Sequence, residues 1–306
     1  MQKYLRNLYI KINKNGWKIT NASPKTYKQI TELHTFCKRA IMVNYFFVYM
    51  VVISLLPFKP QDPYTTMHSI LFFLRNLPPF LFLLLSIVNY SVIFIMAYTI
   101  ISYAFVLLYF TTFLQIQYML INDSLEKIGE NFRHIKAEQL VDYEPYQRQA
   151  YRTICKAVDY HIKLNLVAKD FNESHKNVLV VHLFGCMLSQ ISLLFILGLF
   201  GGLSNPIAIT LMLLESAIIA LTYLYCGVVF QGFNDSITFA LQRCRWESWN
   251  VATRRAMAIF MLNSVEQIQI NAYIFLVDYN LFIWMIHKIT NVYSALLFIN
   301  PEAIQL

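Results

Sequence analysis

The sequence predicts an all-α integral membrane protein, a polytopic helical bundle with helical extensions outside the membrane. Hydrophobic residues make up 57% of the 306 residues, whereas charged residues make up only 14%. No charged side chain occurs from Asn76 to Asn122 or from Asn177 to Leu214, and about 20 apolar residues already span a bilayer. The charges lie in a few blocks between these runs, unlike the evenly charged surface of a soluble protein.

Five apolar runs are expected to span the membrane, at residues 41–58, 89–120, 178–200, 206–230 and 272–298. The remaining chain forms a terminal segment at 1–40, a loop at 59–88, helical regions at 121–177 and 231–271, and a tail at 299–306. The second run has an alternative, because residues 77–121 have room for a helical hairpin that turns near Pro78, Pro79 and Asn89. A hairpin would add a sixth span and reverse the orientation of everything after it.

Basic residues favour the five-span reading. The regions 1–40, 121–177 and 231–271 then lie on one side and hold nine, nine and four Lys and Arg residues, against Lys59 and Arg75 on the other side. Cytoplasmic segments carry the excess of basic residues, so this count places the N-terminus in the cytoplasm and the C-terminus outside. A sixth span would put the basic residues of 121–177 on the wrong side.

The two cytoplasmic regions have different character. The stretch "RCRWESWNVATRR" at 243–255 is basic, and Trp246 and Trp249 are expected at the membrane interface. The region 121–177 is nearly neutral, with nine acidic residues, and is therefore not a lipid- or nucleic-acid-binding segment. Apolar residues at helical spacing predict two amphipathic helices separated by Pro145, with the stripes Leu125, Ile128, Phe132, Ile135 and Ile154, Val158, Ile162, Leu166.

No catalytic, cofactor or metal-binding motif is present in the sequence. The five cysteines are scattered without CxxC spacing, and the chain has no HExxH, GxSxG or GxxxxGK[ST] pattern. These absences argue against an enzyme and lead us to expect no cofactor.

Three ionisable residues are expected at membrane depth, where a charge is costly. Glu215 is either a polar ligand contact, part of an ion pathway or a hydrogen-bonded packing residue. Asp278 is expected to cap a helix, and Lys288, beside His287, either faces water or extends toward the interface. Aromatic residues crowd the first two spans, and they line either an apolar cavity or the lipid.

The second half of the chain resembles the insect odorant receptor family. The similarity runs through "YLYCGVVFQGFNDSITFALQRCRWESW", "TRRAMAIFMLNSVEQ" and "YIFLVDYNLFIWMIHKITNVYSALL", and "AVDYHIKLNLVAKDF" resembles the family's preceding helix. The features that carry it are Tyr225, Cys226, Gly227, Ser236, Ala240, Trp246, the pair Arg254 and Arg255, Ser264, Gln267, Tyr293 and Ser294. The family has a cytoplasmic N-terminus and seven spans, so the resemblance implies that the five spans here are its third to seventh.

The resemblance implies a subunit of a ligand-gated, non-selective cation channel in the plasma membrane, assembled as a heterotetramer with the olfactory co-receptor. The last span would line the pore through Thr290, Tyr293, Ser294, Leu297 and Phe298, with Leu297 or Phe298 nearest an apolar gate. Small volatile odorants would contact Tyr49, Ile53, Tyr90, Phe94, Tyr98, Thr210 and Leu214. Trp246, Arg254 and Arg255 would lie at the subunit interface.

Three alternatives remain at the level of the sequence. A gustatory receptor of the sister family has the same topology, although its usual terminal pattern is absent here. A secondary transporter would show repeat symmetry and helices broken at mid-membrane, whereas the glycine cluster at residues 201–202 lies between spans. A chain without the first two spans is also compatible with a non-conducting subunit.

Overall fold

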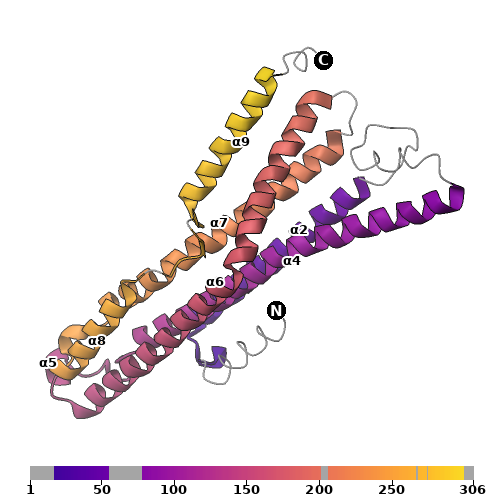
Figure 1. The fold of residues 1–306 in the computed structure, drawn as a ribbon. Coiled ribbons are helices and arrows are strands. Elements are labelled where there is room, and N and C mark those ends of the chain that lie inside the picture. Colours follow the sequence, from indigo (N-terminus) through magenta and orange to yellow (C-terminus); the bar gives the residue numbers. More distant parts are fainter. Residues whose placement is uncertain (1–16, 55–77, 201–205, 267, 274, 300–306) are drawn as a thin grey trace. The chain divides into compact units, whose positions relative to one another are not determined.

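The computed structural model describes residues 17–54, 78–200, 206–266, 268–273 and 275–299 (Figure 1). These residues are almost entirely helical, which confirms the predicted all-α class. The helices are α2 (Pro24–Ser54), α4 (Pro79–Glu126), α5 (Ala137–Leu140), α6 (Glu144–Phe200), α7 (Pro206–Arg243), α8 (Val251–Ser264) and α9 (Tyr279–Ile299). The short elements are the 3-10 turns η1 (Ile19–Asn21), η2 (Glu130–Phe132) and η3 (Trp246–Ser248), and the strands β1 (Asn271–Ala272) and β2 (Phe275–Leu276).

The three longest helices far exceed the length that a bilayer requires. They contain 48 residues in α4, 57 in α6 and 38 in α7. The predicted spans 89–120, 178–200 and 206–230 lie inside these helices, and α4 runs without a break through Asn89, so the alternative hairpin is not formed. The first predicted span belongs to α2 as far as Ser54, while residues 55–58 lie outside the described part of the chain.

Four of the described helices are long and apolar enough to cross a membrane. They are α2, α4, α6 and α7, each with a qualifying apolar stretch. Helix α9 has 21 residues, which is long enough to span a bilayer, and it carries the polar residues Asn280, His287, Lys288 and Asn291.

The predicted last span at 272–298 begins as a strand hairpin and not as a helix. Strands β1 and β2 pair antiparallel, with Asn271 opposite Leu276 and Ala272 opposite Phe275, and Tyr273 in the turn has φ 58°. Helix α9 starts only at Tyr279, where Asp278 Oδ1 accepts a hydrogen bond from Leu281 N at 2.8 Å. Asp278 is thus the N-cap that the sequence predicted. The helix begins seven residues later than the predicted span.

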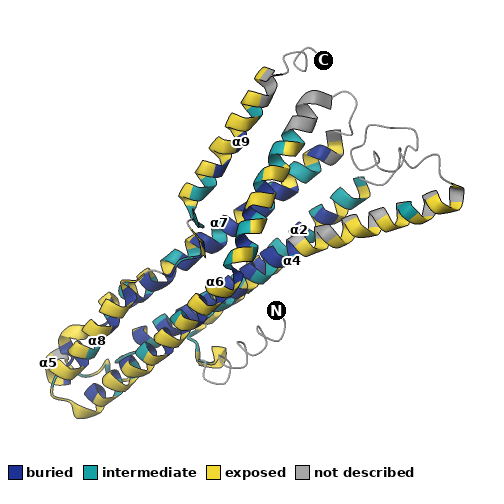
Figure 2. Cartoon of the chain, in the orientation of Figure 1, coloured by how far each residue is buried: buried dark blue, intermediate teal, exposed yellow. Residues whose placement is uncertain are grey.

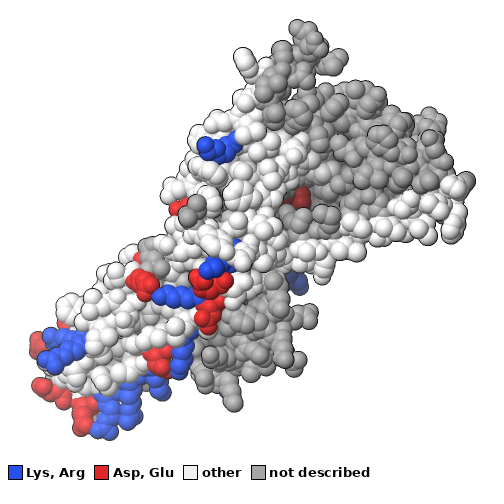
Figure 3. Space-filling view, viewed as in Figure 1, with Lys and Arg blue, Asp and Glu red and all other residues white. Residues whose placement is uncertain are grey.

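The described residues form two compact units. The first unit consists of residues 17–37, 109–176 and 226–276, and the second of residues 38–108, 177–225 and 277–299, within the described ranges. The regions 121–177 and 231–271, predicted to be cytoplasmic, lie almost wholly in the first unit. Over α5, α6 and α8 of this unit Lys, Arg, Asp and Glu side chains gather on the surface (Figure 3).

Stacked aromatic rings and a continuous buried row on α6 form the core of the first unit. Phe110 stacks on Phe171 with ring centroids 3.8 Å apart, and Tyr118 stacks on Phe233 at 4.7 Å. The row that α6 buries consists of Ile154, Ala157, His161, Leu164, Ala168 and Phe171 (Figure 2).

Beyond Ile154 the predicted stripe on α6 does not face the core of this unit. Ile162 is 42% exposed and Leu166 is 56% exposed. Steps of four residues advance about 40° beyond a full turn, because a helix has 3.6 residues per turn. Three such steps rotate the predicted stripe away from the core, whereas alternating steps of three and four keep the buried row on one side. The other predicted stripe is interrupted, because Gly129 with φ 88° follows the end of α4.

A buried carboxylate joins the start of α2 to the end of α4. Asp123 Oδ2 accepts a hydrogen bond from Ser23 N at 3.0 Å, and Asp123 Oδ1 accepts one from Thr26 Oγ1 at 2.7 Å. Lys127 Nζ lies 2.8 Å from Asp123 Oδ2 and also donates to Asn21 O at 2.8 Å. A carboxylate is favourable here because the N-terminus of a helix offers free N–H groups and a partial positive charge.

The second unit is held together by aromatic contacts between helices. Tyr103 of α4 stacks on His182 of α6 with ring centroids 4.5 Å apart, and its ring lies 6.3 Å from that of Tyr223 of α7. Tyr45 of α2 packs against Phe105 of α4 at 4.9 Å. Each of these four helices is therefore fixed to at least one other inside this unit.

Replacing Asp123 with asparagine should destabilise the first unit. Burial raises the pKa of Asp123, which lies in the predicted cytoplasmic region, but hydrogen bonds from Lys127, Ser23 and Thr26 outweigh burial and lower its pKa overall. Loss of the charged acceptor should cost about 1–3 kcal/mol, measured by thermal unfolding of the purified protein in detergent. Because the folded pKa is lowered, this contribution is present above the pKa of an unfolded carboxyl group and is lost as pH falls through the folded pKa.

The matched control for Asp123→Asn is Asp159→Asn. The Asp159 side chain is 67% exposed and pairs with Lys163 one turn along α6. Such a surface pair contributes about 0–1 kcal/mol, so this variant should unfold close to the parent temperature. Equal effects of the two substitutions would contradict the proposed role of Asp123.

Candidate functional site

The predicted ligand residues lie on α2, α4 and α7 of the second unit, and those whose side chains the structure describes are exposed. The exposed fractions are 54% for Tyr49, 48% for Ile53, 44% for Phe94, 55% for Tyr98 and 44% for Leu214. Thr210 is exposed as well, and the side chain of Tyr90 lies outside the described part of the chain. The ligand assignment stays a prediction.

The second unit contains a hollow that the sequence did not predict. It is small and partly open, and it lies where α6 and α7 meet the start of α9. It is lined by Leu183, Cys186, Ala220, Tyr223, Leu224, Val277, Asp278, Leu281, Phe282 and Met285. None of the predicted ligand residues lines it. The side chains of α9 in this wall identify the face with which the helix packs against α6 and α7.

Helix α9 has two chemically different sides. Met285 and Ile289 are each only 7% exposed and lie on the packed side with Leu281 and Phe282. Away from that side, Asn280, His287, Asn291 and Ser294 follow one another at intervals of seven, four and three residues, and all four are exposed. Intervals of three, four and seven residues place side chains on one helix face. A polar row of four residues therefore runs along a helix whose other side is apolar.

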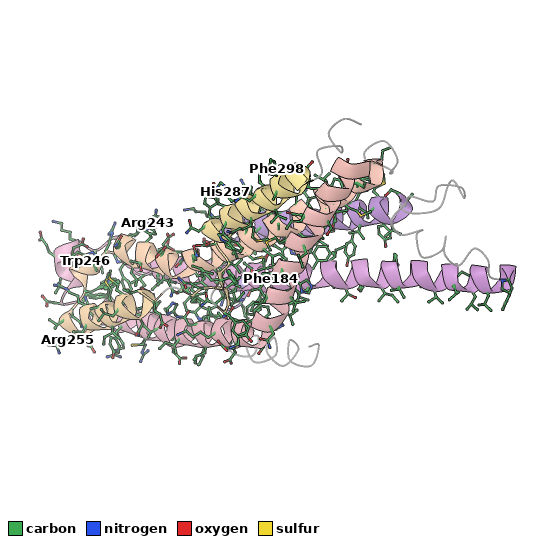
Figure 4. The ribbon with its side chains drawn as sticks, turned by 45° about the horizontal axis from the view of Figure 1, so that its top comes forward. Phe184, Arg243, Trp246, Arg255, His287 and Phe298 are labelled. Carbon is green, nitrogen blue, oxygen red and sulfur yellow. The ribbon has the colours of Figure 1, made fainter. Side chains whose placement is uncertain are left out.

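The predicted pore residues divide between the two sides of α9. Thr290, Ser294 and Phe298 are exposed and lie at four-residue intervals on the polar side, with Phe298 86% exposed. Tyr293 is half-buried and lies nearer the packed side, while the side chain of Leu297 lies outside the described residues. His287, which belongs to the polar row, and Phe298 are marked on α9 in Figure 4. Sequence reasoning missed Asn280 and Asn291, although their spacing from His287 was a readable signal.

Glu215 and Lys288 differ in their surroundings. Glu215 is 8% exposed on α7, and among the described residues neither of its carboxyl oxygens has a hydrogen-bond partner. Glu215 lies five residues after Thr210 and directly after the exposed Leu214, and neither spacing places two side chains on the same face of a helix. The carboxyl group therefore does not share the side of α7 that carries Thr210 and Leu214. Lys288 Nζ of α9 lies 5.8 Å from the centroid of the Trp284 ring, and both residues are exposed.

The stretch "RCRWESWNVATRR" forms a packed junction in the first unit. Trp249 is completely buried, and its Nε1 donates to Tyr146 Oη at 2.9 Å. Gln147 Nε2 donates to Ser248 O at 2.7 Å, while Gln147 Oε1 accepts from Asn250 N at 2.8 Å. Asn250 caps α8 by accepting from Thr253 N. The expectation that Trp249 lies at a membrane interface was therefore wrong, because its indole N–H has a buried partner on α6.

The three residues predicted for a subunit interface have unequal roles in this junction. Arg254 Nε donates to Trp249 O at 2.7 Å, and Arg254 NH2 donates to Glu247 O at 3.0 Å, so Arg254 closes its own loop. Trp246 is 42% exposed and Arg255 is exposed. Both are marked, with Arg243, near the passage from α7 to α8 in Figure 4. Arg243 lies 3.8 Å from Glu126, a contact between this stretch and the acidic residues of 121–177.

The comparison with protein families decides the identity of the chain. A family model described as "7tm Odorant receptor" matches residues 2–287. The chain belongs to the odorant receptor family. A search of curated protein sequences gave no match.

Solved structures of the insect olfactory receptor OR5 from Machilis hrabei have a similar fold. The structure in complex with eugenol matches with a TM-score of 0.64 and 12% identity, over 97% of this chain and 74% of that chain. A second structure of OR5 matches with a TM-score of 0.62 and 11% identity, over 98% of this chain and 75% of that chain. At this identity the likeness shows the shared fold alone.

Membership of the family and the apolar helices together establish a multi-pass membrane protein of the odorant receptor class. The resemblance found in the second half of the sequence is confirmed, because the family model extends over nearly the whole chain. The match also favours an odorant receptor over a gustatory receptor or a transporter. Odorant receptors are known as receptors and not as enzymes.

Truncation of Trp249 should destabilise this odorant receptor far more than truncation of Trp246. Trp249→Ala removes a completely buried indole and leaves Tyr146 Oη without its donor, at a cost of about 3–5 kcal/mol. Trp246→Ala removes a side chain that is 42% exposed and should cost about 1 kcal/mol. Thermal unfolding in detergent, followed by size-exclusion chromatography, measures both. A larger loss for Trp246→Ala would overturn the assignment of Trp249 as the anchor of the junction.

Proposed function

We propose that this odorant receptor is a subunit of a ligand-gated, non-selective cation channel in the plasma membrane, formed together with the olfactory co-receptor. The observation that carries the proposal is the division of α9 into an apolar side packed on α6 and α7 and an exposed polar row. In a lipid environment, polar side chains on a spanning helix face a water-filled passage or the interior of a bundle. The polar row thus suits a helix that borders an ion path.

The same helix supplies a gate in this proposal. Thr290 and Ser294 offer hydroxyl groups along the polar side, and Leu297 and Phe298 follow near the end of the helix. A narrow ring of apolar side chains stops ions because water leaves it, and widening the ring restores the water column. The large exposed surface of Phe298 supports its place in such a ring, since nothing in the described chain covers it.

Small volatile molecules are the proposed ligands. The structure of OR5 with eugenol demonstrates that a protein of similar fold binds a small aromatic compound. Here the aromatic side chains of α2 and α4 with Thr210 and Leu214 of α7 are the proposed contacts, in the same unit as α9. Apolar and aromatic walls select such ligands by shape and volume.

An uncovered apolar row on α8 supports assembly with other subunits. The helix buries Thr253, Met257, Phe260 and Ser264 inside the first unit. Its outer side carries Val251, Ile259, Leu262 and Val265, which are 64%, 56%, 73% and 74% exposed. Contiguous exposed apolar residues mark interaction sites. Arg255 belongs to the same outer side by its four-residue spacing from Val251 and Ile259, and Trp246 lies just before the helix.

The proposed orientation places the N-terminus and the first unit in the cytoplasm and the C-terminus outside. It rests on the excess of Lys and Arg in the regions 1–40, 121–177 and 231–271. The co-receptor would then contact α8 on the cytoplasmic side, while odorants reach the second unit from the membrane or from outside.

Cells that express this chain with the olfactory co-receptor should give an odorant-evoked cation current, tested with a panel of volatile compounds under voltage clamp. Phe298→Ala should widen the apolar ring and produce an inward leak without odorant, because water and cations then pass the constriction. Val292→Ala, on an exposed part of α9 outside the predicted gate, is the control and should leave the resting current unchanged.

Two outcomes would contradict the channel proposal. The first is the absence of any evoked current although both chains reach the cell surface. The second is saturable uptake of a substrate in place of a current, which would favour a transporter.

Co-purification with the co-receptor should fall several-fold for Leu262→Glu and for Arg255→Glu. The first substitution places a charge in the apolar row, and the second reverses a charge beside it, so both add a desolvation or repulsion cost to the contact. Lys163→Glu, on an exposed part of α6, is the control. Arg254 is unsuitable for this test, because it holds its own loop. Unchanged co-purification of both variants would refute a subunit contact at α8.

A further inference from the structure

Lys288 lies near the middle of α9. It is nine residues after Tyr279 and eleven before Ile299, the two ends of the helix. At 1.5 Å per residue these separations are about 14 Å and about 16 Å. A lysine side chain has a flexible four-carbon stem and reaches water from positions near a helix end, but these distances exceed its length. A lysine at this depth in hydrocarbon would be costly, so its ammonium group needs a polar surrounding within the membrane.

The position of the ammonium group points to the side of α9 on which that surrounding lies. Lys288 itself is on the flank between the packed side and the polar row, and it is exposed. Its Nζ, 5.8 Å from the centroid of the Trp284 ring, is directed back along the helix. Trp284 and His287 are three residues apart and therefore neighbours on the helix surface. The charge thus leans toward the polar row that begins at Asn280 and continues through His287.

Among the described residues of α9, Lys288 carries the only formal charge apart from the histidine beside it. Asp278, just before the helix, already accepts hydrogen bonds from Leu281 N and Asn280 Nδ2. Within the described part of the chain, Lys288 forms no ion pair with a carboxylate. Its positive charge is therefore not neutralised within this part of the chain.

We propose that Lys288 makes the ion path beside α9 electropositive and thereby lowers the permeability of divalent relative to monovalent cations, in a channel that still passes both. The inference rests on the proposed channel function and adds a selectivity-determining residue to it. The repulsion between a fixed charge and a passing ion is proportional to the charge of the ion. A divalent cation therefore meets twice the barrier of a monovalent one, and the difference acts as a filter.

The first test compares ion selectivity in cells that express the complete chain with the co-receptor. Lys288→Gln should raise the permeability of calcium relative to sodium about twofold or more, because the repulsion from one unit charge about 8 Å away in a water-like medium lowers the relative entry of the doubly charged ion by about that factor. Lys288→Arg keeps the charge and should leave the ratio at the parent value. Reversal potentials in sodium and in calcium solutions measure the ratio.

A second test does not depend on current. Cysteine is placed at Lys288, His287 or Met285 in a chain whose exposed Cys155 is replaced by serine, and the complexes are treated with a charged, water-soluble methanethiosulfonate reagent. Reaction is expected for Lys288→Cys and His287→Cys. Met285→Cys, on the packed side where the native side chain is 7% exposed, should not react.

The outcomes separate this inference from the proposed function. An evoked current with an unchanged calcium-to-sodium ratio in Lys288→Gln overturns the selectivity role alone. Reaction of His287→Cys without reaction of Lys288→Cys also overturns it, because the lysine would then face lipid. Absence of current in the parent channel, or of labelling at both positions, overturns the channel proposal and the inference with it.

Discussion

The structure depends on the requirement that a chain crossing lipid satisfy its own backbone hydrogen bonds, which leaves a helix as the only form for each apolar run. In this protein α4, α6 and α7 meet that requirement and then continue far beyond it, with 48, 57 and 38 residues. Each of them consequently contributes to both compact units. The parts of these helices beyond the length of a span pack into a core of their own in the first unit. This core consists of the stacked rings, the buried row of α6 and the hydrogen-bonded junction around Trp249.

The cores of the two units are stabilised by different kinds of side-chain contact. In the first unit, buried polar side chains connect the helices by hydrogen bonds. Asp123 binds the start of α2, and Gln147 bridges Ser248 and Asn250. Asn234 is hydrogen-bonded to His161 Nε2 and to Glu266 O, which follows α8. Such groups stabilise a fold only when their partners are in place, since a buried polar atom without one is costly. The second unit relies on ring packing, as between Tyr103 and His182. Glu215 is the exception there, a buried carboxyl group whose oxygens have no partner in the described chain.

Helix α9 packs against α6 and α7 along one side. Its contacts with α6 and α7 surround an open hollow, and a polar row and a lysine occupy its other sides. In the proposed channel, this helix would remain in the bilayer and change its position when a ligand binds. The chain shares its fold with OR5 at 12% identity, so the arrangement of the helices is similar where few residues are.

The sequence by itself determined the all-α class, the apolar runs, the family resemblance and the helix cap at Asp278, because these follow from composition and from contacts between residues close in the chain. It also contained the polar row of α9, readable as spacing although only part of it was recognised. The tertiary structure alone decided that Trp249 is buried, that Ile162 and Leu166 face outward, that Arg254 closes its own loop and that a hollow lies under α9. Periodicity shows that a helix has an apolar side, but the partner that covers it comes from far along the chain, as Asp123 binds Ser23 across 100 residues. Only the packed structure fixes which face meets which partner.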